Sequence, residues 1–307
     1  MKFGAKDGVW PVMVTPFTED GAIDYAALSA LISWYEDCGV DGLFAVCQSS
    51  EMFYLSLQER VNLAAFVKKT AHVPVIASGH VSYALADQAE ELKQIASTGV
   101  DAVILLTNRF ADPSEDSLVW IENLKRLLDQ LPVDLPLGLY ECPYPYKRLI
   151  TEEELQFCAE SGRFHFLKDT CCDINRIRQR IKRVEETPLK LFNANTATLL
   201  ESLEAGASGF SGVMANFHGE LYTWLLKNWK ENPEMAQNLQ ACLTMCSQIE
   251  KQLYPVNAKY SLQLEGIPIH LKSRSKDAGA FSPLFQNEVE QLRRLSAWMR
   301  RELIGVT

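Results

Sequence analysis

Short apolar runs alternate along the chain with longer segments in which apolar residues recur at helical spacing. The first such segment has a single apolar face made of Tyr25, Leu28, Leu31, Ile32 and Tyr35, and Asp24 stands where an N-cap is expected. The short runs lack polar alternation, which is typical of parallel strands that are covered on both faces. The pattern therefore predicts alternating β-strands and α-helices.

A short phrase repeats at points where a helix should give way to a strand. It reads Cys-Gly-Val-Asp-Gly-Leu at 38–43, Thr-Gly-Val-Asp-Ala-Val at 98–103 and, more loosely, Ala-Gly-Ala-Ser-Gly-Phe at 205–210. The glycine suits the left-handed position that ends a helix, and an apolar run follows each time. The repeat marks successive βα units.

Eight strands are expected, and their starts lie roughly 20 to 35 residues apart, as in successive βα units of a closed barrel. We predict an α/β fold, a (β/α)8 TIM barrel with a C-terminal helical extension, and take a doubly wound open sheet as the alternative. Residues 1–230 would form the barrel with the active site, and residues 231–307 a C-terminal helical domain. The expected strands are 9–14, 42–46, 73–77, 102–106, 135–140, 164–168, 189–192 and 209–213.

Charge and composition restrict the classes of molecule that the protein is expected to bind. The 307 residues carry a net charge of -9 and give a pI near 5.2, which opposes binding to nucleic acid or to an anionic membrane. No apolar stretch approaches the roughly 20 residues of a membrane span, and the first ten residues lack a secretory signal. We expect a cytoplasmic protein that binds a small molecule.

Eight cysteines include no C-x-x-C pair, so most should be free thiols. Cys242 and Cys246 could share a helical face, but neither a histidine nor a second cysteine pair completes a zinc set. We expect no metal and no cofactor.

Catalytic groups of a parallel barrel gather at the C-terminal ends of its strands. Polar residues end three of the expected strands, at 47–51, 139–143 and 166–169. Lys168 closes the apolar run Phe-His-Phe-Leu, so its ammonium should be partly desolvated, which lowers the pKa and frees the amine to attack a carbonyl. The alternative is a lysine that only pairs with a neighbouring carboxylate.

Further motifs carry a family resemblance that runs nearly end to end. Val-Met-Val-Thr-Pro-Phe at 12–17 precedes Gly-Ala-Ile-Asp at 21–24, Ser-Ser-Glu at 49–51 precedes Phe-Tyr-Leu-Ser at 53–56, and Asn216 follows the last strand. In order and spacing the chain resembles the dihydrodipicolinate synthase and N-acetylneuraminate lyase superfamily of Schiff-base aldolases.

The resemblance implies roles for four residues. Lys168 would form the Schiff base and Tyr140 would move protons, unless Tyr140 is a buried structural tyrosine. Ser49 and Ser50 would hold the carboxylate of pyruvate. Glu51 would brace this loop by accepting backbone hydrogen bonds, with direct chemistry as the alternative. The family also implies a homotetramer built as a dimer of dimers.

The chain departs from the family pattern at several positions. Pro145 stands where dihydrodipicolinate synthases carry an arginine for the second substrate, and residues 107–113 contain no tyrosine for their proton relay. Cys47, Gln48 and Ser50 alter the loop that usually reads glycine, two small residues, glycine and glutamate. Glu141 replaces an asparagine and could meet a substrate hydroxyl, with a solvated loop carboxylate as the alternative.

The sequence therefore predicts a pyruvate-dependent Schiff-base lyase or aldolase that acts on a 2-oxo-3-deoxy sugar acid or a related 2-oxo acid. Asn193, Asn195 and Ser211 could contact sugar-acid hydroxyls, unless they only cap strand ends. The alternatives are a 4-hydroxy-tetrahydrodipicolinate synthase-like activity and a non-catalytic relative that binds a 2-oxo acid. A purely structural protein is a third, since fold alone never excludes it.

Overall fold

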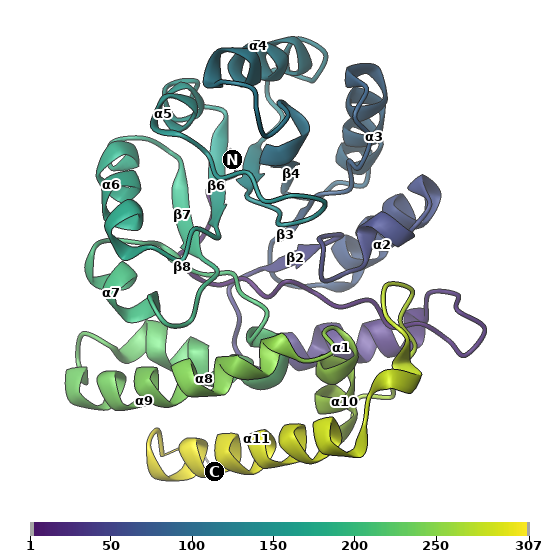
Figure 1. The fold of residues 1–307 in the computed structure, drawn as a ribbon, viewed down its shortest axis with the longest axis vertical. Coiled ribbons are helices and arrows are strands. Elements are labelled where there is room, and N and C mark those ends of the chain that lie inside the picture. The colour runs from purple at the N-terminus through teal and green to yellow at the C-terminus, as the bar shows by residue number, and fades with distance from the viewer. Residues whose placement is uncertain (1–2, 306–307) are drawn as a thin grey trace.

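Eight parallel strands and eight helices alternate in the computed structural model, which describes residues 3–305 (Figure 1). Each predicted strand is present, which confirms the βα periodicity. The strands are β1 (Gly8–Val9), β2 (Leu43–Ala45), β3 (Val75–Ala77), β4 (Ala102–Leu106), β5 (Leu137–Tyr140), β6 (Phe164–Asp169), β7 (Lys190–Asn193) and β8 (Gly209–Phe210).

The strands form one sheet in the order β1-β8-β7-β6-β5-β4-β3-β2, so every strand lies beside its neighbour in sequence. A parallel bridge between Val12 and Phe44 joins the chain after β1 to β2 and closes the ring. The (β/α)8 barrel is confirmed and the open sheet is wrong, because an open doubly wound sheet reverses its strand order at a switch point.

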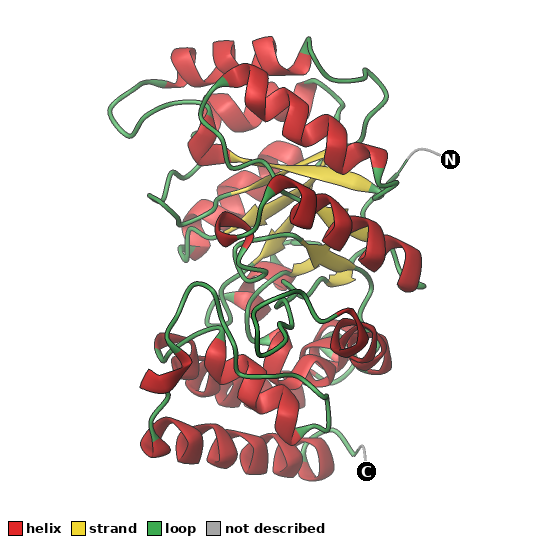
Figure 2. Cartoon of the chain, turned by 90° about the vertical axis from the view of Figure 1, so that its right-hand side faces the viewer, coloured by secondary structure: helices red, strands yellow, loops and turns green. Residues whose placement is uncertain are grey.

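The helices surround the sheet (Figure 2). The predicted N-cap of the first helix is confirmed, since the Asp24 carboxylate accepts hydrogen bonds from Ala26 N and Ala27 N, both at 3.0 Å. The barrel helices are α1 (Tyr25–Asp37), α2 (Leu57–Thr70), α3 (Leu85–Ser97), α4 (Ser117–Leu128), α5 (Glu152–Glu160), α6 (Ile174–Val184), α7 (Leu199–Glu204) and α8 (Ala215–Asn228).

Three further helices follow the barrel and lie along the side that carries α8 (Figure 1). They are α9 (Pro233–Cys246), α10 (Val256–Leu264) and α11 (Pro283–Glu302), with a 3₁₀ turn η3 (Ser247–Lys251) after α9. Their buried Leu239, Leu262 and Met299 belong to the same apolar core as the barrel, so the division at residue 230 remains a proposal. Within residues 3–305 no helix is both long and apolar enough to span a bilayer.

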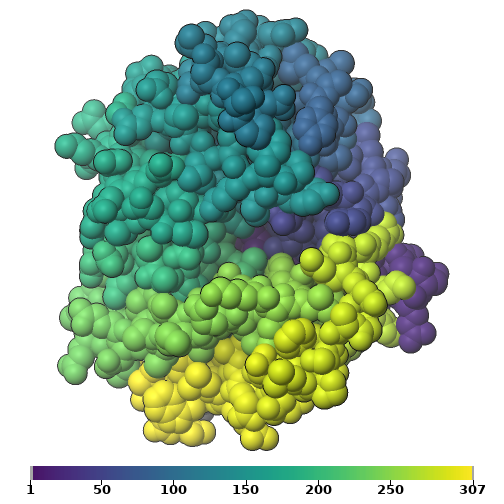
Figure 3. Space-filling view, viewed as in Figure 1, coloured from purple at the N-terminus to yellow at the C-terminus, as the bar shows by residue number. Residues whose placement is uncertain are grey.

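The C-terminal segment also reaches the beginning of the chain. Figure 3 shows the yellow C-terminal surface against the purple N-terminal segment, and the Arg274 guanidinium donates to the Gly21 carbonyl at 2.8 Å. The loop between α10 and α11 thereby lies at the same end of the barrel as the strand termini.

Aromatic side chains fill the barrel interior. Trp10 meets Phe166 edge to face with ring centroids 5.5 Å apart, and Phe166 stacks on Phe192 at 4.1 Å. All three are buried, so the barrel is a packed core below the strand ends rather than a channel.

Closure of the ring depends on glycine where β1 pairs with β8. Gly8 lies opposite Gly209, and a Cβ added to Gly209 would stand 1.9 Å from the Gly8 carbonyl oxygen. Gly209→Ala should therefore lower the free energy of unfolding by about 3 kcal/mol, because the clash is with backbone that cannot rotate away.

Urea denaturation measures this loss. Gly4→Ala is the control, since a Cβ there meets nothing within 4 Å, and its effect should stay within about 0.5 kcal/mol. Equal stability of the two variants would contradict the role assigned to this pair.

Candidate active site

A cavity of ≈ 270 Å³ opens at the C-terminal ends of the strands. Barrel residues and residues from the C-terminal extension share its wall, and an active site at this end is expected for the fold. Its polar lining includes Gln48, Ser49, Tyr140, Lys168, Tyr254 and Lys276.

Lys168 is the penultimate residue of β6 and is paired in register with Tyr140 at the end of β5. The side chain is only 3% exposed, and within residues 3–305 its ammonium has no hydrogen-bond or ion-pair partner. Burial lowers the pKa of Lys168 to about 8. Among the described residues no carboxylate forms an ion pair with Lys168: the adjacent Asp169 pairs with Arg180, and Glu250 acts on the amine only at longer range.

Tyr140 lies beside the amine, whose Nζ stands 4.6 Å from the centroid of the phenol ring. The ring packs edge to face on Phe44, and burial raises the pKa of Tyr140 well above its ordinary value. The phenol is therefore protonated at neutral pH. A protonated hydroxyl beside an amine is a suitable proton donor for carbonyl chemistry.

The two serines of the second-strand loop face different ways. Ser49 lines the cavity. The Ser50 hydroxyl instead donates to the Met13 carbonyl at 2.7 Å and accepts from the Cys47 amide at 3.1 Å. The structure does not direct the Ser50 hydroxyl toward the cavity, because this side chain ties the loop to the chain after β1.

Glu51 adopts a left-handed backbone conformation, with φ of 60°, at the end of this loop. Its buried carboxylate pairs with Lys259 at 2.9 Å and accepts from the Ser273 hydroxyl at 2.7 Å. It also accepts backbone hydrogen bonds from Arg274 at 2.7 Å and Ser275 at 2.8 Å, so the predicted bracing role is confirmed. Burial would raise the pKa of Glu51, but Lys259 and the other donors outweigh it and lower the pKa.

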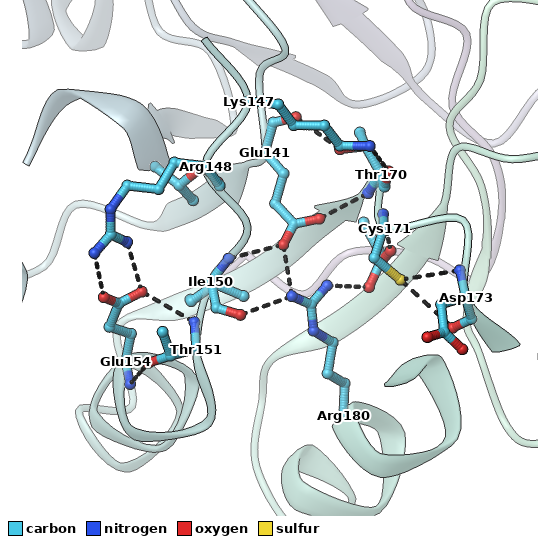
Figure 4. A network of polar contacts seen from close by, with 12 residues as sticks. Glu141, Lys147, Arg148, Ile150, Thr151, Glu154, Thr170, Cys171, Asp173 and Arg180 are labelled. Carbon is cyan, nitrogen blue, oxygen red and sulfur yellow. Dashed lines mark hydrogen bonds and ion pairs between the residues drawn. The ribbon is translucent and has the colours of Figure 1, made fainter. Parts of the chain in front are cut away.

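Glu141 points away from the cavity into a buried ion-pair network (Figure 4). Its carboxylate contacts Arg180 at 2.7 Å and accepts from the amides of Ile150 at 2.9 Å and Thr170 at 2.8 Å. Arg180 also pairs with Asp169. Neither a substrate contact nor a solvated loop carboxylate describes Glu141, which is fully buried.

Burial and the neighbouring Asp169 raise the pKa of Glu141. Burial alone would lower the pKa of Arg180, but the two carboxylates raise it above its ordinary value. The arginine is thus permanently charged between two acids. Asp169, next to Lys168, and Glu141, next to Tyr140, are therefore both engaged away from the amine.

The three residues proposed to meet sugar hydroxyls are engaged within the protein. The Asn193 amide donates to the Thr198 hydroxyl at 3.0 Å, and Asn195 Oδ1 accepts from the Thr198 amide at 3.1 Å. The Ser211 hydroxyl donates to the Trp10 carbonyl at 2.9 Å. The structure does not bring these three side chains to the cavity wall, which matches the capping alternative.

Sequence reasoning missed the contribution of the C-terminal extension. Tyr254 and Lys276 line the cavity. Glu250, in η3, interacts electrostatically with Lys168, and burial raises the pKa of Glu250 to about 7. No motif pointed to these residues, because their spacing reflects packing across the barrel mouth rather than a local pattern.

Metal ligation is not indicated. Within the described residues, no three His, Cys, Asp or Glu side chains are grouped so as to hold a metal ion. Cys242 and Cys246 are both free thiols.

The sequence of residues 5–292 matches the model of the Dihydrodipicolinate synthetase family. The chain belongs to this family. It is therefore an enzyme of the class I aldolase and lyase type, and a pyruvate-dependent lyase.

Two relatives align with this chain over most of their own length. A 4-hydroxy-tetrahydrodipicolinate synthase from Bacillus subtilis (strain 168) is 28% identical over 276 residues, which is 88% of this chain and 91% of the relative. A protein of the same name from Oceanobacillus iheyensis is 27% identical over 273 residues, or 88% of this chain and 90% of the relative. Identity at this level supports the family without fixing the substrate.

Solved structures share the fold. Dihydrodipicolinate synthase DapA-2 from Bacillus anthracis superposes with a TM-score of 0.83 at 20% identity, covering 95% of this chain and 99% of that one. YagE, a prophage protein of E. coli K12 solved in complex with pyruvate, gives 0.82 at 23% identity, covering 97% and 99%.

The network around Glu141 yields a prediction about stability. Arg180→Met should lower the free energy of unfolding by about 3–5 kcal/mol, because it leaves two buried carboxylates without their cation. Arg178→Met on the same helix is the control, since its pair with Glu201 is half exposed and should contribute less than about 1 kcal/mol. Chemical denaturation measures both, and a loss no larger in Arg180→Met would contradict the assignment.

The pKa of Lys168 predicts how its reactivity depends on pH. Competitive labelling with acetic anhydride, followed by mass spectrometry, reports the neutral fraction of each amine. Labelling of Lys168 should level off above pH 8 and fall about tenfold per unit below it, because only the neutral amine reacts. In the denatured chain the same peptide should level off near 10.5. A native midpoint near 10.5 would show that the amine is not desolvated.

Proposed function

We propose that Lys168 forms a Schiff base with pyruvate and that the enzyme breaks or makes the adjoining carbon–carbon bond of a 2-oxo acid. The observation that carries the proposal is a buried amine without an ionic partner, beside a protonated phenol, in a cavity at the strand ends. Burial makes this amine nucleophilic at near-neutral pH, as covalent catalysis requires.

In the cleavage direction, the Lys168 amine adds to the C2 carbonyl of the substrate. Tyr140 gives its proton to the departing hydroxyl, water leaves and an iminium forms. The Tyr140 phenolate then takes the proton of the C4 hydroxyl while the C3–C4 bond breaks. The electron pair of that bond moves to the iminium and gives an enamine. An aldehyde leaves, Tyr140 gives this proton to C3, and water hydrolyses the resulting iminium to release pyruvate and free Lys168.

Ser49 is proposed to hold the carboxylate of the bound 2-oxo acid. It lines the cavity, whereas Ser50 supports the loop from behind through Met13. A fixed carboxylate would place C2 within reach of Lys168 in an attack geometry.

The substrate we propose is a 2-oxo-3-deoxy sugar acid or a related 2-oxo acid. The names of the relatives favour 4-hydroxy-tetrahydrodipicolinate synthase activity as the second candidate. Pro145 and the absence of tyrosine from residues 107–113 speak against it. A non-catalytic relative would bind a 2-oxo acid in the cavity without converting it to product.

Two further proposals rest on the resemblance and the composition. We propose a homotetramer built as a dimer of dimers, following the family. We also propose a cytoplasmic location, in keeping with the acidic composition.

Borohydride reduction in the presence of pyruvate tests the Schiff base, because it converts an imine into a stable amine. Intact-mass analysis should show one pyruvate-sized adduct, and peptide mapping should place it on Lys168. Lys168→Ala should lose the adduct, while Lys251→Ala, at an exposed lysine, should keep it. A folded wild-type protein without an adduct would refute the proposed chemistry.

A further inference from the structure

The cavity has a second lysine whose charge is not used within the protein. Among the described residues, the lysines, arginines, aspartates and glutamates that line the cavity are Lys168, Glu51 and Lys276. The Glu51 carboxylate is occupied by Lys259 and by the segment that carries Lys276. The Lys276 ammonium has neither a hydrogen-bond acceptor nor an ion-pair partner within residues 3–305.

The backbone that carries Lys276 is fixed, although its side chain is exposed. The Lys276 amide donates to the Ser273 hydroxyl at 3.1 Å, and that hydroxyl donates to the Glu51 carboxylate at 2.7 Å. The Ser275 amide donates to the same carboxylate. The loop of Ser49 and the backbone of Lys276 are therefore held by one buried acid, so the relative position of the two walls is set before substrate binds.

Aromatic and apolar groups occupy much of the remaining wall. Phe53 and Tyr144 are in contact with ring centroids 4.8 Å apart, and Tyr254 and Pro255 also line the cavity. Apolar groups beside a lysine keep water from part of its surroundings, which strengthens its attraction to an anion at the cavity mouth.

The cavity wall leaves one cation for a second substrate group. Among the described cavity residues, Lys276 is the cation that remains when Lys168 is committed to covalent chemistry.

We propose that Lys276 binds a second anionic group of the substrate, so that the enzyme acts on 2-oxo acids with a carboxylate at the far end from the carbonyl. This inference rests on the proposed Schiff-base function. An ammonium on a flexible stem is a point charge without the fixed fork of arginine, so it accepts carboxylates over a range of positions. Cleavage would then release pyruvate and an aldehyde that keeps the second carboxylate.

Two 2-oxo acids of equal chain length provide the test. 2-Oxoglutarate has a distal carboxylate, and 2-oxopentanoate has a methyl group in its place. Both can form an imine with a lysine, and borohydride traps either one. The concentration that gives half-maximal adduct on Lys168 is measured for each acid in the full-length enzyme.

We expect the wild type to require a lower concentration of 2-oxoglutarate than of 2-oxopentanoate, by a factor of about five to ten for one partly desolvated ion pair. Lys276→Met should remove this preference by weakening only the response to the diacid. Lys276→Arg should retain it, and added salt should reduce it.

Lys272→Met is the matched control. It removes the same charge from the same segment, but Lys272 is not among the cavity residues, so the preference should persist. Trapping of pyruvate should be unchanged in Lys272→Met, and far-UV circular dichroism shows that both variants are folded.

The outcomes separate the two proposals. If pyruvate forms no adduct with the wild type, the Schiff-base function fails. If pyruvate is trapped but the wild type shows no preference for the diacid, or Lys276→Met leaves the preference intact, only the role of Lys276 is overturned. Equal losses in Lys276→Met and Lys272→Met would assign the effect to overall charge and would also overturn it.

Discussion

The buried ion pair between Glu51 and Lys259 is the constraint on which the site depends. Both side chains are almost entirely withdrawn from water, a situation that is tolerable only when charge and hydrogen bonds are satisfied together. Glu51 meets this condition with partners from α10 and from the loop after it. The left-handed turn at Glu51 and the position of the cavity wall are thus fixed by the same acid.

A second set of buried charges explains why Lys168 remains reactive. Glu141 and Asp169 lie on the chain close to the two proposed catalytic residues. Either carboxylate could have formed an ion pair with the Lys168 amine. Arg180 instead engages both acids behind the strand ends. The cavity side is left with Lys168, the Tyr140 phenol and the more distant charge of Glu250. Separation of these charges into two layers keeps the amine desolvated without an adjacent counter-ion.

The sequence predicted the barrel well, because parallel strands are continuous apolar runs and their spacing is regular. Strand ends were less predictable. The run at 9–14 pairs with β8 only at its start and then bridges β2 at Val12, so the continuous strand ends at Val9. Lys168 was singled out because it closes an apolar run, and Tyr140 and Ser49 were singled out through the family motifs.

Other parts of the site leave no trace in a local pattern. Alternation along a strand decides whether a side chain enters the barrel, and Glu141, next to Tyr140, faces the opposite way. Asn193 and Ser211 also end strands, but backbone and hydroxyl groups nearby satisfy them. The contributions of Tyr254 and Lys276 depend on contacts between segments some 200 residues apart, which periodicity cannot report.

The separation in sequence between Glu51 and its partners also bears on how the molecule is made. The acid belongs to the second βα unit, whereas Lys259, Ser273 and Ser275 follow it by 208, 222 and 224 residues. During synthesis the barrel strands emerge long before these partners, and folding proceeds in that interval. A nascent barrel therefore carries an uncompensated acid at its mouth, and the site becomes complete only when nearly the whole chain has left the ribosome.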